Sequence, residues 1–331
     1  MKQSDKKLRV FNEPDLSNYN RILLFPHIMP DGDCVGSAIA MYYALVNMGK
    51  EVYVVLDDEL PNNLEFLNID ENDNKIIVDS KFIEINNIDY DLCITLDLSN
   101  TDRLGDREKF IKNSVVWNID HHKTNILFGN YHTIMGDVSS AGEVLYTYFE
   151  RMGINITSKM AECLYTAIST DSGSFIYDCT TSRTLYIASK LMDKIEDFNK
   201  IITNLYLSKS KEMLVLHSMV LNNMKFYSND KIVISYLDNE MLKISGAKMD
   251  MSEGIVEEMR NISGVEVSCL LKEKEYGMKV SLRSKSFLDV SKIAFEHDGG
   301  GHNKAAGFNL YIKDVNEAIE YMKNILEKMV Y

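Results

Sequence analysis

The chain has 331 residues, of which 45% are hydrophobic, and its formal net charge is -13. This length exceeds the ~250 to 300 residues at which a single core stops growing, so it predicts two domains. The acidic balance argues against long-range attraction to nucleic-acid backbones, because proteins that bind long nucleic acids normally present a basic face.

Export, membrane insertion and disulfide bonding are also disfavoured. No apolar run approaches the ~20 residues of a membrane span, and the start MKQSDKKLRVFNEPD lacks the apolar stretch of a secretory signal. The five cysteines are odd in number and form no C-x-x-C pair. We therefore expect a cytoplasmic protein with reduced thiols.

The front of the chain alternates strand and helix patterns. Apolar runs predict strands at 21–27, 51–56, 90–97 and 114–120, and a helix is expected from Cys34 to Met48. Such alternation predicts an α/β domain with a mostly parallel sheet flanked by helices. The Asn- and Asp-rich segment 68–91 is expected at the surface, with at most a short strand. In such sheets ligands bind at the carboxyl ends of the strands.

The pattern changes behind the fourth strand. Ala161, Leu164, Tyr165 and Ile168 have the spacing of one helix face, and this helix leads into Asp171. A polar helical stretch follows, and then strands at 231–237, 266–273, 278–285 and 308–312, with a final helix from Asp314. We therefore expect a first domain at 1–195, a helical linker at 196–215 and a smaller α+β domain at 216–331.

Acidic and imidazole side chains follow the predicted strands. The segment HIMPDGD supplies His27, Asp31 and Asp33, the next strand ends in Asp97, and SVVWNID ends in Asp120. The strand ending in Asp120 is followed by His121 and His122, and the later helix ends in Asp171. Since parallel strands end at one edge of a sheet, we expect these groups to meet there.

A cluster of carboxylates could not stay ionised without cations, because like charges at short range disfavour the charged form. The first 215 residues carry 32 Asp and Glu against 21 Lys and Arg, which agrees with such a cluster. Aspartate oxygens mixed with histidine nitrogens suit Mn²⁺ or Mg²⁺, and less well Fe²⁺, Co²⁺ or Zn²⁺. Two ions ~3.5 to 4 Å apart would support phosphoester hydrolysis.

A single histidine or aspartate at a strand end is more often a turn or capping residue than a ligand. The metal-centre hypothesis is favoured because four separate segments each deliver a ligand type to the edge where the fold predicts a site.

These segments resemble the DHH phosphoesterase superfamily, which takes its name from a triplet like the one at 120–122. HIMPDGD, LDLSNTDRLG, NIDHHKTNILFGNY and STDSGSF are similar to its motifs in order and spacing. FEHDGGGHNKAAGF resembles the glycine-rich signature of its associated C-terminal domain. Within the superfamily, the length and the two domains look like the nanoRNase/pAp phosphatase group. One departure is Met29, at a position where relatives often have Asn.

The resemblance implies two ions, most simply Mn²⁺, with Mg²⁺ as the alternative. His27, Asp31 and Asp97 would hold one ion, and Asp33, Asp97, His121 and Asp171 the other. Asp97, His122 and Asp120 would be catalytic, with Asp97 bridging the ions, His122 facing the substrate phosphate and Asp120 orienting His121.

The second domain is the predicted substrate clamp, with the active site in the cleft between the domains. Strand alternation puts Lys279, Ser281, Arg283 and Lys285 on one face. Glycine runs let backbone N–H groups approach an anion. The predicted substrate contacts are Arg103, His122, Arg283, Ser284, Gly299, Gly300, Gly301 and His302.

The resemblance implies hydrolysis of short RNA, including linear pApA, to 5′-mononucleotides, as in 3′–5′ oligoribonucleases, and of pAp to AMP. The polarity of attack stays open. The catalytic alternatives are a cyclic-di-AMP phosphodiesterase, a RecJ-type single-strand exonuclease and an inorganic pyrophosphatase that shares the metal motifs. The alternative of another class is a non-catalytic nucleotide sensor. Expected partners are small nucleotides, not long duplexes or membranes, and relatives are often homodimers.

Overall fold

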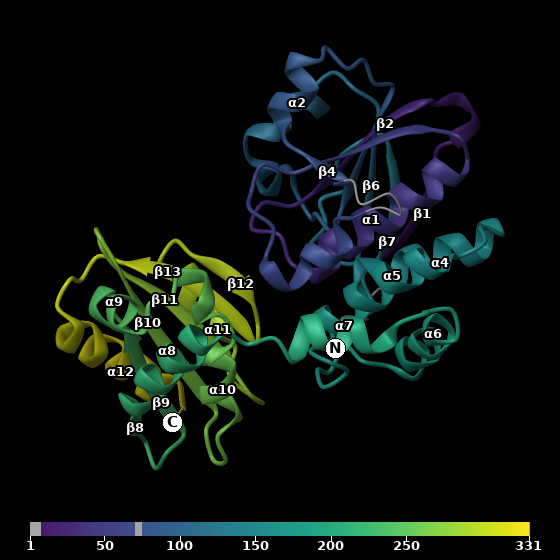
Figure 1. Cartoon of the computed structure of the whole chain (residues 1–331). Helices are drawn as coiled ribbons and strands as arrows, with labels where there is room; N and C mark the ends of the chain where they lie inside the picture. The colour runs from purple at the N-terminus through teal and green to yellow at the C-terminus, as the bar shows by residue number, and fades with distance from the viewer. Residues whose placement is uncertain (1–7, 70–74, 331) are drawn as a thin grey trace, which may run out of the picture. The chain divides into compact units, whose positions relative to one another are not determined.

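The computed structural model describes residues 8–69 and 75–330. It divides the chain into two compact units, at 1–208 and 209–331, each with its own sheet (Figure 1). The active-site cleft expected between the two domains stays a prediction. The first seven residues and part of the Asn- and Asp-rich segment, residues 70–74, lie outside the described residues.

A seven-stranded sheet forms the centre of the first unit. In spatial order its strands are β1 (Arg9–Asn12), β7 (Tyr131–Met135), β6 (Val116–Asp120), β5 (Leu92–Leu96), β2 (Arg21–Pro26), β3 (Glu51–Val55) and β4 (Ile77–Val78). Only β1 pairs antiparallel, on the outer side of β7. The prediction of a mostly parallel sheet flanked by helices is confirmed.

Helices cover both faces of this sheet. They are α1 (Gly32–Asn47), α2 (Ser80–Ile85), α3 (Glu108–Ile111), α4 (Ala141–Met152), α5 (Ser158–Asp171), α6 (Ser182–Met192) and α7 (Phe198–Tyr206), with 3₁₀ turns η1 (Leu16–Asn18), η2 (Asn62–Leu67) and η3 (Thr101–Arg107). In β2, Ile22 and Leu24 face the core under α1, α4 and α5, while Leu23 and Phe25 face the core that includes α2 and α3. A strand buried on both faces must be apolar throughout, which explains the run ILLF.

The strand order reverses beside β2. The chain runs from β2 through α1 to β3 on one side, and later returns to place β5 on the other side of β2. Pro26 pairs with Leu96, and Leu96 pairs with Ile119, so one row of residues crosses the carboxyl ends of β2, β5 and β6. Such a switch point leaves a crevice where ligands bind in open α/β sheets.

The second unit is an α+β domain, as expected. Its sheet has the order β12 (Gly300–His302), β13 (Ala305–Leu310), β11 (Gly277–Ser284), β10 (Val267–Lys274), β9 (Ile232–Leu237) and β8 (Lys225–Tyr227). Its helices are α8 (Lys211–Asn222), α9 (Asn239–Ser245), α10 (Ile255–Asn261), α11 (Val290–Phe295) and α12 (Val315–Val330), with the 3₁₀ turn η4 (Met249–Ser252). The helix α12 packs on β9 and β10, whereas α8 and α10 pack on the other face of the sheet.

Two helices, α7 and α8, begin in the segment predicted as one linker, and each packs in the core of a different unit. Ile201 of α7 is fully buried in the core of the first unit, and Leu216 of α8 is fully buried in a core of the second. The division between Ser208 and Lys209 lies between these helices. Among the described residues no helix is long and apolar enough to span a bilayer.

Candidate metal centre

The first group of predicted ligands surrounds the start of α1. Asp31 is the N-cap of this helix, and its Oδ1 accepts hydrogen bonds from the backbone N–H groups of Asp33 and Cys34. Its Oδ2 remains 3.2 Å from Nε2 of His27, which follows β2 and is almost fully buried. The helix cap therefore fixes one oxygen of Asp31 and leaves the other beside His27.

Asp97 lies between two imidazoles. Its Oδ2 is 3.5 Å from Nε2 of His27, and its Oδ1 is 3.3 Å from Nε2 of His121. The backbone of Asp97 has φ of +63°, in the left-handed region that a residue with a side chain enters at a cost of ~1 to 3 kcal/mol. This unusual turn aims the two carboxylate oxygens at two different histidines.

Asp33 is held by a helix far along the chain. Its Oδ2 accepts a hydrogen bond of 2.7 Å from Ala141 N, and its Oδ1 accepts one of 2.9 Å from Gly142 N. These N–H groups open α4, where unpaired donors and the helix dipole favour an anion. Oδ2 also lies 3.7 Å from Nε2 of His121.

His121 completes the cluster with Asp171. Asp171 ends α5, and its Oδ2 is 3.5 Å from the same Nε2 that faces Asp33 and Asp97. One imidazole nitrogen thus has three carboxylates within 3.7 Å. The structure brings together all six side chains that the sequence predicts as ligands.

The role predicted for Asp120 needs a correction. Its Oδ1 lies 2.7 Å from Nδ1 of His122, so the side chain that it orients is His122 and not His121. The reason is the turn after β6, because Asp120 is fully buried at the end of the strand and the chain that leaves the strand brings His122 back beside it.

The electrostatics of the cluster follow from burial and close charges. Burial would raise the pKa of Asp97, but the imidazoles of His121 and His27 outweigh it and hold that pKa well below its usual range. Burial and the charge of Asp97 raise the pKa of Asp33 well above its usual value. Burial raises the pKa of Asp171 to about 6, against the opposing effect of His121.

The imidazoles complement these carboxylates. Burial alone would lower the pKa of His27 and of His121, yet the neighbouring carboxylates raise both. Carboxylates and imidazoles this close together compete for protons. A cation that binds here must displace any proton from its ligands, so its affinity should increase with pH.

Two observations indicate that the cluster suits a metal ion. Oδ1 of Asp97 is buried and accepts no hydrogen bond from the described residues, although imidazole nitrogens of His121 and His122 lie 3.3 and 3.5 Å away. Buried polar atoms normally have a partner. The sets Asp33, His121, Asp171 and His27, Asp31, Cys34 also bring their ligand atoms within 4.8 Å of one another.

Cys34 is a neighbour that the sequence did not single out. Its Sγ accepts a hydrogen bond from Asp31 N and donates one to Asp31 O, completing the cap of α1. Burial raises the pKa of this thiol to about 12, so it stays protonated at neutral pH. These two bonds make Cys34 part of the cap of α1.

Comparison with known proteins agrees with this arrangement. Residues 21–168 match the DHH family, N-terminal domain, and residues 229–328 match the DHHA1 domain. The chain carries a DHH domain and a DHHA1 domain. The resemblance predicted from its motifs is thereby confirmed.

Several relatives match both domains together. The bifunctional oligoribonuclease and PAP phosphatase NrnA of Thermus thermophilus is 28% identical, with 95% of this chain and 92% of the relative covered. The protein of the same name from Bacillus subtilis is 25% identical, with 92% and 94% covered. An exopolyphosphatase-related protein from Bacteroides fragilis has a solved structure that superposes with a TM-score of 0.87, at 28% identity and with 95% and 93% covered.

Arg103 lies beside the metal cluster of the DHH domain. Its Nη2 is 2.8 Å from Nδ1 of His27, and its carbonyl oxygen accepts a hydrogen bond from Ile28 N. These bonds dock the segment after Asp97 on the segment after β2. Its contact with a substrate phosphate stays a prediction.

In the DHHA1 domain the predicted substrate residues have different surroundings. Arg283 of β11 is half-buried, and its Nε donates a hydrogen bond of 2.7 Å to Glu257. Ser284 is almost fully buried, and its hydroxyl donates to Leu288 O, so the prediction that it contacts substrate is wrong for this conformation. Alternation along β11 explains this, since Ser284 points to the opposite side from Arg283.

The glycine run of the DHHA1 domain forms an edge strand and not a turn. Gly300, Gly301 and His302 make up β12, which pairs antiparallel with β13. A Cβ on Gly299 would meet Gly307 O at 2.4 Å, whereas one on Gly300 would meet nothing within 4 Å. Gly300 and Gly301 line a hollow with Ser291, Lys292 and Phe295, also lined by Asp289 and Glu296. Gly300 and Gly301 are exposed in this hollow, and an anion contact by their backbone stays a prediction.

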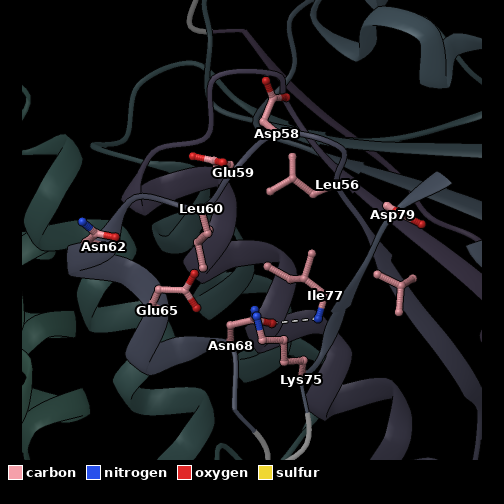
Figure 2. Close-up of a pocket in the computed structure, with 11 residues that line it drawn as sticks. Leu56, Asp58, Glu59, Leu60, Asn62, Glu65, Asn68, Lys75, Ile77 and Asp79 are labelled. Atoms are coloured by element: carbon pink, nitrogen blue, oxygen red, sulfur yellow. Dashed lines mark hydrogen bonds between the residues drawn. The ribbon is translucent and has the colours of Figure 1, made fainter. Parts of the chain in front are cut away.

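The DHH domain also has a hollow, whose lining residues Figure 2 shows. Four carboxylates, of Asp58, Glu59, Glu65 and Asp79, line it together with Lys75 and with Leu56, Leu60, Asn62, Asn68, Ile77 and Val78. Oδ1 of Asn68 accepts a hydrogen bond of 2.8 Å from Ile77 N across its floor. None of the metal-cluster residues lines this hollow, and its acidic walls do not suit a phosphate.

Proposed function

We propose that this protein is a phosphoesterase that hydrolyses short oligoribonucleotides to 5′-mononucleotides and pAp to AMP with two divalent cations, most simply Mn²⁺. The observation that carries the proposal is the position of Asp97. Each of its oxygens faces a different histidine, and Oδ1 is buried without a hydrogen bond from the part of the chain that the structure describes. A carboxylate so placed can bridge two cations.

The proposed ligands form two sets that share Asp97. One set is His27, Asp31 and Asp97, and the other is Asp33, Asp97, His121 and Asp171. Oxygen and imidazole donors without thiolate favour Mn²⁺ or Mg²⁺ over softer ions. When bound, such a pair of cations supplies an activated water and compensates the charge that develops on the phosphoryl group.

Other side chains would bind and orient the substrate. His122 is partly exposed, and the carboxylate of Asp120 fixes its ring through Nδ1, so we assign it a contact with a phosphate oxygen of the substrate. Burial would lower the pKa of His122, but the hydrogen bond to Asp120 and the charge of Asp97 raise it. In the DHHA1 domain, Arg283 and the accessible backbone of Gly300 and Gly301 would bind a further phosphate.

Relatives support nucleotide substrates. Two curated relatives that cover more than nine tenths of this chain bear the name of an oligoribonuclease and PAP phosphatase. The net charge of -13 favours short substrates over long duplexes. A cytoplasmic location and the alternative substrate cyclic di-AMP remain predictions from the sequence.

The decisive experiment incubates the purified protein with Mn²⁺ or Mg²⁺ and a panel of 5′-labelled dinucleotides, longer RNAs, pAp, cyclic di-AMP and inorganic pyrophosphate. We expect phosphate from pAp and mononucleotides from the dinucleotides. Tight nucleotide binding without any hydrolysis would instead indicate a sensor. Preferential cleavage of pyrophosphate or of long single strands would favour the other family activities.

A further inference from the structure

The motif NIDHHKTN ends in Asn125, a buried residue to which the proposed chemistry gives no role. It lies five positions after Asp120, in the turn that follows the two histidines. The turn is closed by a hydrogen bond from Asn125 N to His122 O. A buried amide normally satisfies its hydrogen-bonding groups, so its partners indicate what it holds in place.

The amide of Asn125 has three acceptors on one side and one donor on the other. Its Nδ2 lies 2.6 Å from Oδ2 of Asp120, 2.8 Å from Oδ1 of Asn118 and 3.1 Å from Leu98 O. Its Oδ1 accepts a hydrogen bond of 2.7 Å from Leu127 N. Only a group that donates on the first side and accepts on the second fits this position.

Asn118 extends the network to the neighbouring strand. It is fully buried within β6, and its Nδ2 donates to Thr95 Oγ1 of β5 and to Leu98 O, each at 3.0 Å. Leu98 follows Asp97 directly. Two amides therefore converge on one carbonyl, next to the residue with the left-handed backbone and the proposed bridging carboxylate.

This network connects the two strand ends that carry the proposed chemistry. On one side Asn125 bonds to Asp120, whose other oxygen holds His122. On the other side Asn125 and Asn118 bond to the carbonyl oxygen of Leu98, the residue after Asp97. We propose that Asn125 is a positioning residue that fixes His122, through Asp120, relative to Asp97. The inference rests on the proposed phosphoesterase function.

The charge of the site makes the amide specific. A carboxylate at position 125 would face the carboxylate of Asp120, the amide oxygen of Asn118 and a carbonyl, with no donor between them. Like charges at such a distance repel strongly in a buried site. Asn125→Asp changes the size of the side chain little, so it tests this chemistry more directly than truncation does.

A matched control lies at the opposite end of the same strand. The side chain of Asn130 also bonds to β6, since its Oδ1 accepts a hydrogen bond of 2.9 Å from Val116 N. It is exposed, and it contacts none of the proposed ligands. Asn130→Asp keeps an acceptor for Val116 N and introduces the same charge as Asn125→Asp without touching the network.

The test compares Asn125→Asp with Asn130→Asp and the wild type, after circular dichroism has shown that each is folded. With Mn²⁺ and pAp, kcat of Asn125→Asp should fall on the order of 10²-fold because a shift of ~1 Å can cost this much. KM should stay within about threefold. In NMR spectra of the metal-free proteins, the downfield Nδ1 proton signal of His122, assigned by its loss in His122→Gln, should shift or vanish only in Asn125→Asp.

The inference is overturned if folded Asn125→Asp keeps kcat within about twofold of Asn130→Asp, or if the His122 proton signal is the same in both. If Asn125→Asp does not fold, Asn125→Ser is judged by the same two measurements, because its shorter side chain removes the Nδ2 donor that Asp120, Asn118 and Leu98 share. If the wild type hydrolyses no substrate, the NMR comparison alone decides, so failure of the proposed function is a separate result.

Discussion

Oδ1 of Asp97 lies 3.3 Å from Nε2 of His121, yet it is buried and accepts no hydrogen bond from the described residues. A cation bound by both atoms would give this oxygen the partner that it lacks among the described residues.

The substitution Asp97→Asn should remove the ligand that both proposed ions share. We expect kcat on pAp and on pApA to fall by at least about 10³-fold, and calorimetric titration to show a loss of tight Mn²⁺ binding. Asp102→Asn, in the same motif but outside the cluster, is the control and should keep both properties. Near-normal rates in Asp97→Asn would contradict the two-ion assignment.

Besides its proposed role as a metal ligand, Asp33 accepts hydrogen bonds from two backbone N–H groups at the start of α4. Asp33→Ala should lower the free energy of unfolding by about 1 to 2 kcal/mol even without metal, because two backbone N–H groups lose their acceptor. Urea unfolding in a chelator measures this effect. Ser140→Ala removes the N-cap hydroxyl of the same helix, and it should cost a similar amount while Mn²⁺ binding is preserved.

Met29 is strained and exposed. Its φ of +53° lies in the left-handed region, where Asn is more readily accommodated, and 63% of its surface is accessible. Met29→Asn should therefore raise the free energy of unfolding by about 0.5 to 1 kcal/mol. Met152→Asn, at an exposed position in α4, should not stabilise the protein. A melting temperature of Met29→Asn below that of the wild type would contradict the strain argument.

Glu266 should make the stability of the DHHA1 domain depend on pH. Its carboxylate accepts hydrogen bonds from the backbone of Ser286, Phe287 and Leu288 and from the Ser286 hydroxyl. Burial would raise the pKa of Glu266, but these bonds outweigh it and lower that pKa. The folded state therefore binds its proton less readily than the unfolded state.

The stabilisation by Glu266 is fully present above the unfolded pKa, near ~4.3, and is lost as pH falls through the lower folded pKa. Glu266→Gln should cost about 1 to 3 kcal/mol at pH 7, and its difference from the wild type should shrink in acid. Urea unfolding at several pH values between about 3 and 7 measures this difference in the free energy of unfolding, because this range brackets the pKa values. Glu275→Gln, in the exposed turn between β10 and β11, should show no such change.

Much of the site could be predicted because its signals are local. The apolar runs that end in His27, Asp97 and Asp120 report buried parallel strands, and parallel strands deliver their carboxyl ends to one edge. The helix that leads to Asp171 was visible from its periodicity. The family motifs gave the same positions.

Other features were not predictable from local patterns. The strand β1 is short and mostly exposed, and it pairs with β7, more than 100 residues later. Alternation along β11 gives the side on which Ser284 lies, but its partner Leu288 O lies in the segment after the strand, and no local pattern specifies that bond. Asp120 pairs with His122 because of the way the chain turns after β6, which no spacing rule specifies.

The amino-acid sequence by itself determined which residue types stand at the ends of which strands, and therefore that acids and imidazoles would meet at one edge of a parallel sheet. Hydrophobic periodicity is enough for that, because each strand or helix is defined by its own neighbours. Only the tertiary structure decided that Asp33 would accept a hydrogen bond from Ala141 N. It also decided that Asn125 would connect Asp120 to the carbonyl oxygen of Leu98. Such hydrogen bonds join segments that are distant in sequence, and their geometry exists only once the sheet and its helices have packed.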